Sequence, residues 1–225
     1  MRRLLVLLVF FATMASSVPA YAWDFYWSVG QEGTGQPNNA GIWWGVQADN
    51  YVFSPTDITN SSDGIKVNAI LGQTYDGRQM VEAGWCKHGP SGALNYFYSY
   101  KKNGTYYGPY HCGSATAGNR TLKLYWAGSD YWQYYVDNSA KATYILNPYI
   151  TSAVVGTQAE VHFVPDNNYA HFWNLKQWDK NSRTWKAWTK LYPLHLDPYH
   201  RGTGTTQDHY YPSKVTNTDW YSKHQ

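Results

Sequence analysis

Two short runs, RQMVEAGWC (residues 78–86) and GTQAEVHFV (residues 156–164), each centre on a glutamate within an otherwise strand-like pattern. Glutamate is scarce in this chain: only Glu32, Glu82 and Glu160 occur, against 22 Tyr, 12 Trp and 19 Gly. A carboxylate in a sheet is costly to bury unless it is paired or hydrogen-bonded. The presence of two glutamates in predicted strands therefore needs a structural or functional explanation.

Strand periodicity predicts the surroundings of each glutamate, because alternate residues of a strand share one face. The apolar residues of the first run then lie on the core face, and Glu82 lies on the opposite face with Met80, Gly84 and Cys86. In the second run, Gln158 and His162 flank Glu160 on its face. Gly84 and Gly156 are expected to leave open space beside the carboxylates.

The first 22 residues read as a secretory signal peptide. MRR is followed by an apolar stretch and by the A-x-A sequence that ends at Ala22. The apolar stretch is short for a membrane span. We therefore expect cleavage after Ala22 and a secreted, extracellular chain without a membrane anchor.

The net charge and the length of the chain limit the kinds of partner and the number of domains that we expect. Without Arg2 and Arg3 the chain has 16 Lys and Arg against 15 Asp and Glu, which gives no electrostatic reason to expect a nucleic-acid partner. About 203 residues remain after cleavage, a size that suits one domain, and we expect a monomer.

Cys86 and Cys112 are the only cysteines, and in an exported chain they predict one disulfide.

Short runs rich in Tyr, Trp, Val and Ile alternate with turn residues along most of the chain, which is the pattern of an all-β protein. We predict a β-sandwich or jelly roll, with a sandwich domain at 41–194, an N-terminal extension at 23–40 and a polar C-terminal tail at 195–225 that packs on the sandwich or trails from it. Turns are predicted at 102–105, 127–130 and 179–184. The predicted strands are 41–48, 64–73, 78–86, 94–103, 104–112, 121–128, 131–138, 141–147, 152–164, 170–179 and 184–191.

Two carboxylates on one concave sheet surface can perform acid–base chemistry, because close carboxylates cannot both ionise easily and one keeps its proton. The alternative is that each glutamate is an ordinary surface residue paired to a Lys or Arg across the strand. The adjacent Trp43 and Trp44 are candidate substrate-binding residues. One of the two faces the core and the other faces the opposite surface.

The stretch MVEAGWCKHGPSGALNYFYSYKKNGTYYGPYHCG (residues 80–113) resembles the central segment of the neprosin-like glutamic peptidases, in which an E-A-G-W strand leads into a Tyr-rich hairpin. AVVGTQAEVHF (residues 153–163) is similar to the block that carries the second catalytic glutamate, and GIWWGVQA (residues 41–48) fits the strand before the first block. The resemblance covers residues 41–164.

This resemblance implies a concanavalin-like sandwich of two bent antiparallel sheets, with Glu82 and Glu160 as a catalytic dyad on the concave face. It further implies a secreted endopeptidase that is active at acidic pH, needs no cofactor and acts on polypeptides, with Pro-rich substrates as candidates. The related fungal glutamic peptidases use a Gln–Glu pair. Gln158 and Ala159 replace the usual Gly-Gly before the second glutamate. Plant members carry a long activation propeptide, whereas here fewer than 20 residues separate the expected cleavage site from the first predicted strand.

Two other readings remain open. A non-catalytic sandwich could bind glycans or peptides through surface Trp and Tyr, and a small jelly-roll glycoside hydrolase of the xylanase type could use the two strand glutamates. No H-E-x-x-H or comparable ligand spacing occurs among the eight histidines, so no metal site is expected. A serine nucleophile lacks its G-x-S-x-G elbow.

Overall fold

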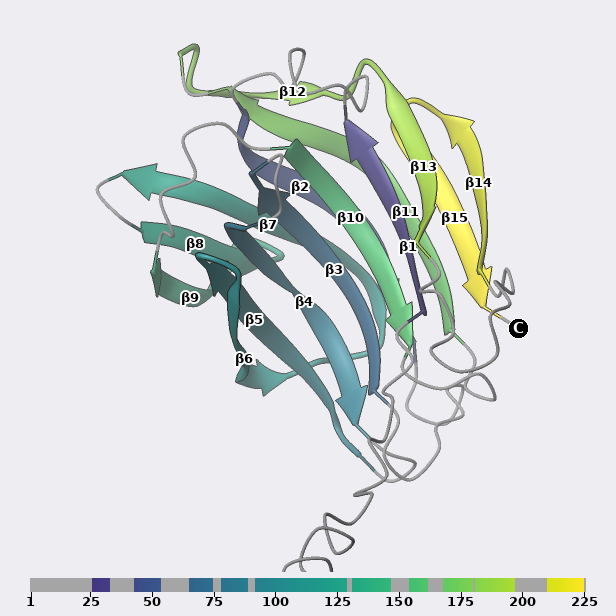
Figure 1. Cartoon of the computed structure of the whole chain (residues 1–225), viewed down its shortest axis with the longest axis horizontal. Helices are drawn as coiled ribbons and strands as arrows, with labels where there is room; N and C mark the ends of the chain where they lie inside the picture. Colours follow the sequence, from purple (N-terminus) through teal and green to yellow (C-terminus); the bar gives the residue numbers. More distant parts are fainter. Residues whose placement is uncertain are drawn as a thin grey trace, which may run out of the picture.

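The computed structural model describes fifteen β-strands, all paired antiparallel, in two sheets stacked as layers (Figure 1). None of the described residues forms a helix long and apolar enough to cross a membrane. The described residues are 26–32, 43–53, 65–74, 78–88, 92–128, 131–146, 154–161, 168–179, 181–196 and 210–224.

Sheet A has seven strands and contains both strands with a candidate glutamate, β4 and β10. In spatial order its strands are β13 (Leu191–Leu196), β1 (Tyr26–Glu32), β10 (Val154–Val161), β3 (Ile65–Gln73), β4 (Met80–His88), β5 (Leu94–Lys102) and β6 (Thr105–Ser114).

Sheet B has eight strands, one of which, β12 (Thr184–Ala187), pairs only with β11. The remaining order is β14 (Tyr210–Thr216), β15 (Asp219–His224), β11 (Asn168–Asp179), β2 (Trp43–Val52), β7 (Gly118–Gly128), β8 (Tyr131–Val136) and β9 (Ser139–Leu146). The all-β sandwich predicted from the sequence is confirmed.

The core between the sheets is built from alternate residues of both, and it contains large aromatic side chains with polar atoms. Three of these side chains form hydrogen bonds across the layers, as is usual for buried polar atoms, whereas Trp132 Nε1 and Trp188 Nε1 have no hydrogen-bond partner among the described residues. Trp85 Nε1 of sheet A donates to Asn50 Oδ1 of sheet B at 2.6 Å. The Tyr134 hydroxyl of sheet B donates to the Gly84 carbonyl at 2.9 Å, and Trp220 Nε1 donates to Thr157 Oγ1 at 2.8 Å.

Each of the eleven predicted strands overlaps an observed one, and the predicted turns at 102–105 and 179–184 are confirmed by turn residues at 103–104 and 181–183. The third predicted turn, at 127–130, includes residues 129 and 130, which lie outside the described residues. The β5–β6 hairpin turns on Asn103 and Gly104, which have φ values of 53° and 86°. An Asn-Gly pair adopts such left-handed angles readily, which suits the two-residue turns of twisted hairpins.

The chain ends differ from the prediction, because both contribute strands to the sandwich. Residues 23–40 contain β1, which pairs with β10 and β13 in sheet A. Residues 195–225 contain β14 and β15, which extend sheet B next to β11. Trp220 of β15 is fully buried in the core, so the bounds 41–194 are too narrow for the sandwich. Polar, turn-rich sequences can still pair as strands at a sheet edge, where one side of each strand needs no apolar cover.

Candidate functional site

Glu82 lies on β4 with its side chain on the outer face of sheet A, as the alternation predicted. Its neighbours Val81, Ala83 and Trp85 are fully buried in the inter-sheet core. Glu82 is nevertheless only 3% exposed. The face that carries it is therefore covered, and its carboxylate requires hydrogen-bonding partners.

Two hydroxyl groups meet the Glu82 carboxylate. Ser99, which lies opposite Glu82 on β5 and is fully buried, donates to Glu82 Oε1. The Tyr106 hydroxyl, from β6, lies 2.5 Å from the same oxygen and 2.7 Å from Ser99 Oγ. Tyr106 is 46% exposed, so this group of three connects a buried carboxylate to the surface.

Ser99 and Tyr106 were not among the site residues predicted from the sequence. The hairpin turn contained the necessary signal, since a two-residue turn at 103–104 fixes the register in which Lys101 faces Tyr106. Lys101 and Ser99 share a face by alternation. Tyr106 thus lies diagonally across from Ser99, within reach of a long side chain. Gly108, further along β6, is needed for close packing, since a Cβ there would lie 2.8 Å from Ser99 Cβ.

Gly84, next to Glu82 on the same face, does not provide the open space that the sequence indicated. A Cβ at position 84 would lie 2.1 Å from the Asn68 carbonyl oxygen of β3. The absence of a side chain lets β3 and β4 approach closely, and this packing accounts for the glycine without a ligand.

Glu160 lies on the same face of sheet A as Glu82 but not beside it. Its register partner on β3 is Val67, which faces Cys86, whereas Glu82 faces Leu71, which in turn faces Gly156. The two glutamates are thus two strands and four residues apart. With ordinary strand spacing and rise, their Cα atoms are about 16 Å apart in a flat sheet. The register does not bring the predicted dyad into direct contact.

The other candidate residues are dispersed. Gln158 occupies the row of Ala69 and Gly84, between the rows of the two glutamates, and His162 lies outside the described residues. Trp43 and Trp44 lie on β2 of sheet B and therefore do not share a face with Glu82. Trp44 packs against Trp126 with ring centroids 4.7 Å apart. The sequence could not reveal which sheet β2 joins, because that depends on long-range pairing.

The predicted disulfide is wrong. Cys86 and Cys112 are free thiols, because they lie on opposite faces of sheet A. Cys112 packs against the inter-sheet core, whereas Cys86 packs with Val67, Ala69 and Phe97 on the outer face. Burial raises the pKa of the Cys86 thiol to about 12 and that of the Cys112 thiol to about 11. Neither is a ready thiolate nucleophile.

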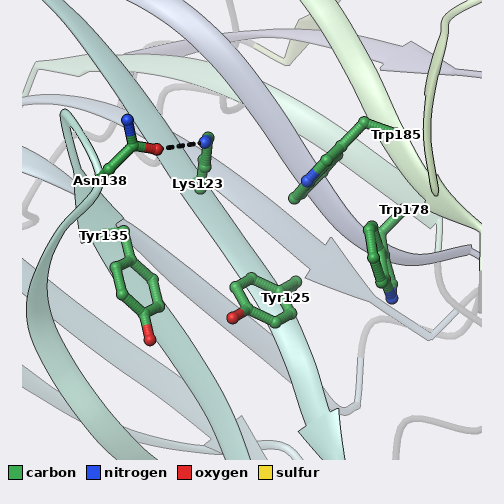
Figure 2. Close-up of a pocket in the computed structure, with 6 residues that line it drawn as sticks. All are labelled: Lys123, Tyr125, Tyr135, Asn138, Trp178 and Trp185. Carbon is green, nitrogen blue, oxygen red and sulfur yellow. Dashed lines mark hydrogen bonds between the residues drawn. The ribbon is translucent and has the colours of Figure 1, made fainter. Parts of the chain in front are cut away.

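A second surface feature lies on the outer face of sheet B, and we call it the aromatic groove (Figure 2). Its volume is about 370 Å³, within the ordinary range for small-ligand pockets. Figure 2 shows the rings and the two polar side chains around a common space. Its lining residues are Lys123, Tyr125, Tyr135, Asn138, Trp178 and Trp185.

Ring contacts and hydrogen bonds hold the residues of the groove in place. The Tyr125 and Tyr135 rings stack at 5.8 Å, and the hydroxyls of both donate to Gln133 Oε1. Lys123 Nζ donates to Asn138 Oδ1 at 2.5 Å. Burial, with the hydrogen bond to Tyr135 second, raises the pKa of Tyr125 to about 12, so its hydroxyl keeps its proton at any physiological pH.

Comparison with known proteins supports the fold and nothing finer. No family model matches the chain, and no curated protein matches it. SCP-B, a member of the eqolisin family of peptidases solved in a complex with the tripeptide Ala-Ile-His, is similar with a TM-score of 0.54 at 10% identity, over 91% of this chain and 99% of that chain.

Scytalido-glutamic peptidase is similar to the same degree. Its complex with a peptide-based transition-state analogue gives a TM-score of 0.55 at 11% identity, over 91% of this chain and 99% of that chain. Its complex with a transition-state analogue inhibitor gives 0.56 at 10% identity, over 90% and 98%. The chain therefore has the sandwich fold of these glutamic peptidases.

Proposed function

We propose that this chain is a secreted glutamic-type endopeptidase in which Glu82 is the central acid–base group. The observation that carries the proposal is the buried Glu82 carboxylate with its two hydroxyl partners, Ser99 and Tyr106. The similarity in fold to glutamic peptidases supports the same function, as does the resemblance of residues 80–113 to the neprosin-like family. The substrate is a polypeptide cleaved at acidic pH, with bonds after proline as the expected sites.

In this mechanism Glu82 takes a proton from a water molecule as the water oxygen bonds to the peptide carbonyl carbon. The bond between that carbon and the peptide nitrogen then breaks, and Glu82 returns the proton to the leaving amine. Ser99 holds the carboxylate in position from the buried side. Tyr106, on the exposed side, is the group placed to donate a hydrogen bond to the substrate carbonyl oxygen as its negative charge develops.

Glu160 is the second carboxylate of the proposed site, with a role that follows from its offset from Glu82. An extended peptide advances about 3.3 Å per residue, so a Cα separation of about 16 Å spans roughly five residues of substrate. We therefore assign Glu160 to substrate binding away from the cleaved bond. A proton shared directly between the two carboxylates would need a different register.

The test is hydrolysis of Pro- and Gln-rich peptides by the mature chain, beginning at Trp23, across acidic to neutral pH. Glu82→Gln should lower kcat by about 100-fold or more, the range of general acid–base catalysis. Glu160→Gln should act mainly on KM. The matched control is Glu32→Gln, which changes the one remaining glutamate, on β1 of the same sheet, and should leave activity unchanged.

The alternatives give distinct results. Equal and non-additive losses of kcat in Glu82→Gln, Glu160→Gln and the double variant would show that the carboxylates act as one unit, restoring the dyad. A folded wild-type chain that cleaves nothing at any pH would refute the peptidase proposal.

A second candidate function is glycan binding, which the aromatic groove of sheet B favours. Exposed Trp and Tyr rings can stack on the apolar faces of sugars, and amide and ammonium groups can hydrogen-bond their hydroxyls. Trp178 and Trp185 are half-buried and stand 5.3 Å apart, next to Lys123 and Asn138. Retention on polysaccharides that Trp185→Ala abolishes and Glu82→Gln leaves intact would support this function. No retention on any polysaccharide would exclude it.

The glycoside hydrolase hypothesis is not supported by the positions of the two glutamates. A retaining mechanism needs two carboxyl groups only about 5–5.5 Å apart. The register that separates Glu82 from Glu160 by four residues and two strands works against that geometry.

A further inference from the structure

Three side chains with metal-binding atoms meet on the outer face of sheet A, four residues along β4 from Glu82. They are Cys86 and His88 of β4 and His111 of β6. Their ligand atoms all lie within 4.8 Å of one another, and Cys86 Sγ lies 3.8 Å from His111 Nε2. The two imidazole rings are in edge contact with centroids 5.4 Å apart.

Local sequence explains how the cluster forms. Cys86 and His88 are two residues apart on one strand, so their side chains share a face. His111 reaches the same face because the pairing of β5 with β6 shifts register between Tyr98 and Tyr100, which places His111 opposite Phe97. Gly108, with a φ of 115°, lies within this irregular stretch. Bulges of this kind commonly redirect a side chain near a functional site.

The separations suit a tetrahedral site. A zinc ion takes sulfur at about 2.3 Å and imidazole nitrogen at about 2.0–2.1 Å. At tetrahedral angles these lengths place sulfur and nitrogen roughly 3.6 Å apart, close to the 3.8 Å between Cys86 and His111. A thiolate with two imidazoles is a donor set that zinc accepts and that magnesium and calcium do not favour.

We propose that Cys86, His88 and His111 form a zinc site with one coordination position open. Exposure rises from the buried Cys86, through the half-buried His88, to the exposed His111, so the open position faces solvent. Phe97, Val67 and Ala69 form an apolar floor around the sulfur. Three protein ligands and an open position are the arrangement of zinc sites that bind an exchangeable ligand.

Two other uses of Cys86 fit less well. A disulfide with Cys112 would have to pass through the sheet, as shown above. A Cys–His nucleophile would need its sulfur to reach a substrate, but Cys86 is only 1% exposed. The site was not predicted from the sequence because its third ligand comes from β6, two strands from β4, and only folding brings it close.

The experiment uses the mature chain after treatment with a chelator, titrated with Co²⁺ as a spectroscopic substitute for zinc. We expect one Co²⁺ per chain, with the thiolate-to-cobalt charge-transfer absorption and the strong visible bands of four-coordinate cobalt. An equivalent of Zn²⁺ should remove both signals. The assay does not depend on peptidase activity, so its failure and that of the proposed function are separable.

The variants test each ligand. Cys86→Ser should lose the charge-transfer absorption, and His88→Ala or His111→Ala should weaken binding by about 100-fold, at or above what outer-shell changes cost. Cys112→Ser and His171→Ala are matched controls, because Cys112 packs on the core side and His171 bonds to Asp219 in sheet B. Both should bind as the wild type does.

Absorption that persists in Cys86→Ser would overturn the proposal, as would binding weaker in the controls than in the ligand variants. Exclusive binding of Cu(I), with no site for Co²⁺ or Zn²⁺, would overturn the assignment to zinc. If Cys86→Ser does not fold, His111→Ala decides, because its side chain is exposed and its loss should leave the core intact.

Discussion

The two outer faces of the sandwich follow the same strand alternation and yet differ in what they do with polar and aromatic groups. On sheet A the outer face buries its reactive residues: Glu82, Ser99 and Cys86 are each at most 3% exposed. On sheet B the aromatic groove keeps Trp178 and Trp185 partly accessible beside polar side chains. Strand alternation therefore predicts which side chains point away from the core, but it does not predict whether those side chains are exposed to solvent or buried.

This difference separates two kinds of chemistry. A buried carboxylate held by hydroxyl groups is suited to proton transfer, because a poorly solvated site strengthens each interaction within it. A row of accessible aromatic rings is suited to binding a ligand that stacks on its surface. The sandwich thus offers a candidate catalytic face and a candidate binding face on opposite layers.

The largest expected effect compares two tryptophans. Trp85 lies in the core beneath the Glu82 face, fully buried and bonded to Asn50, so Trp85→Ala should lower the free energy of unfolding by about 3–5 kcal/mol. Trp185→Ala should cost less than about 1 kcal/mol, the size of a cross-strand pair contribution. Denaturant unfolding of both variants measures the two values. Similar losses of unfolding free energy in the two variants would mean that the groove rings stabilise the fold as the core rings do. The two outer faces would then not differ in the way described.

A smaller effect distinguishes Tyr134 from Tyr135, neighbours on β8 that point to opposite sides of sheet B. The Tyr134 hydroxyl donates to the Gly84 carbonyl beneath the Glu82 face, and burial raises its pKa well above the ordinary value. Tyr134→Phe removes that buried donor and should cost about 1–3 kcal/mol. Tyr135→Phe removes a half-buried hydroxyl that water can replace, and its unfolding free energy should stay within about 0.5 kcal/mol of wild type. A larger loss of unfolding free energy in Tyr135→Phe would mean that the groove residues contribute to the stability of the fold.

The sequence predicted the sandwich well because its information is local. Turn chemistry at 103–104 and alternation within residues 78–86 depend on adjacent residues, and both are confirmed. The chain ends were misjudged because an edge strand such as β14 gains its stability from backbone pairing with β15, for which side-chain pattern gives little evidence.

The site was only half predictable for a related reason. Alternation placed Glu82 on the outer face of sheet A, but it could not assign β2 to a sheet or fix the register of β10 against β3. Those long-range pairings put Trp44 in the other sheet, set Glu160 four residues out of line with Glu82, and placed Cys86 and Cys112 on opposite faces. They also assembled the cluster of Cys86, His88 and His111, whose third member is 23 residues from His88 in the sequence and therefore does not complete a short metal motif.

The smallest effect concerns the turn between β11 and β12, which lies between Trp178 and Trp185 of the aromatic groove in the sequence. Asp179 ends β11, next to Trp178, and accepts hydrogen bonds from Lys186 and Ser182. These bonds, with that of Lys186 the largest cause, lower the pKa of Asp179 from 3.8 to about 2. A lowered pKa means that the stabilisation is complete above the ordinary pKa and is lost only as the pH falls through about 2.

The hairpin formed by β11 and β12 should therefore remain intact throughout a peptidase assay at moderately acidic pH, and loosen only below it. Tryptophan fluorescence followed downward from about pH 5 should show a small, salt-sensitive transition in the wild type, because Trp178 and Trp185 flank this turn and surface ion pairs are screened. Asp179→Asn should lack that transition while leaving the Glu82 reaction unchanged. Identical titration curves for the two proteins would show that the turn does not control the groove. A simultaneous change in peptide hydrolysis would show that the two faces are coupled through the core, against the separation drawn between them.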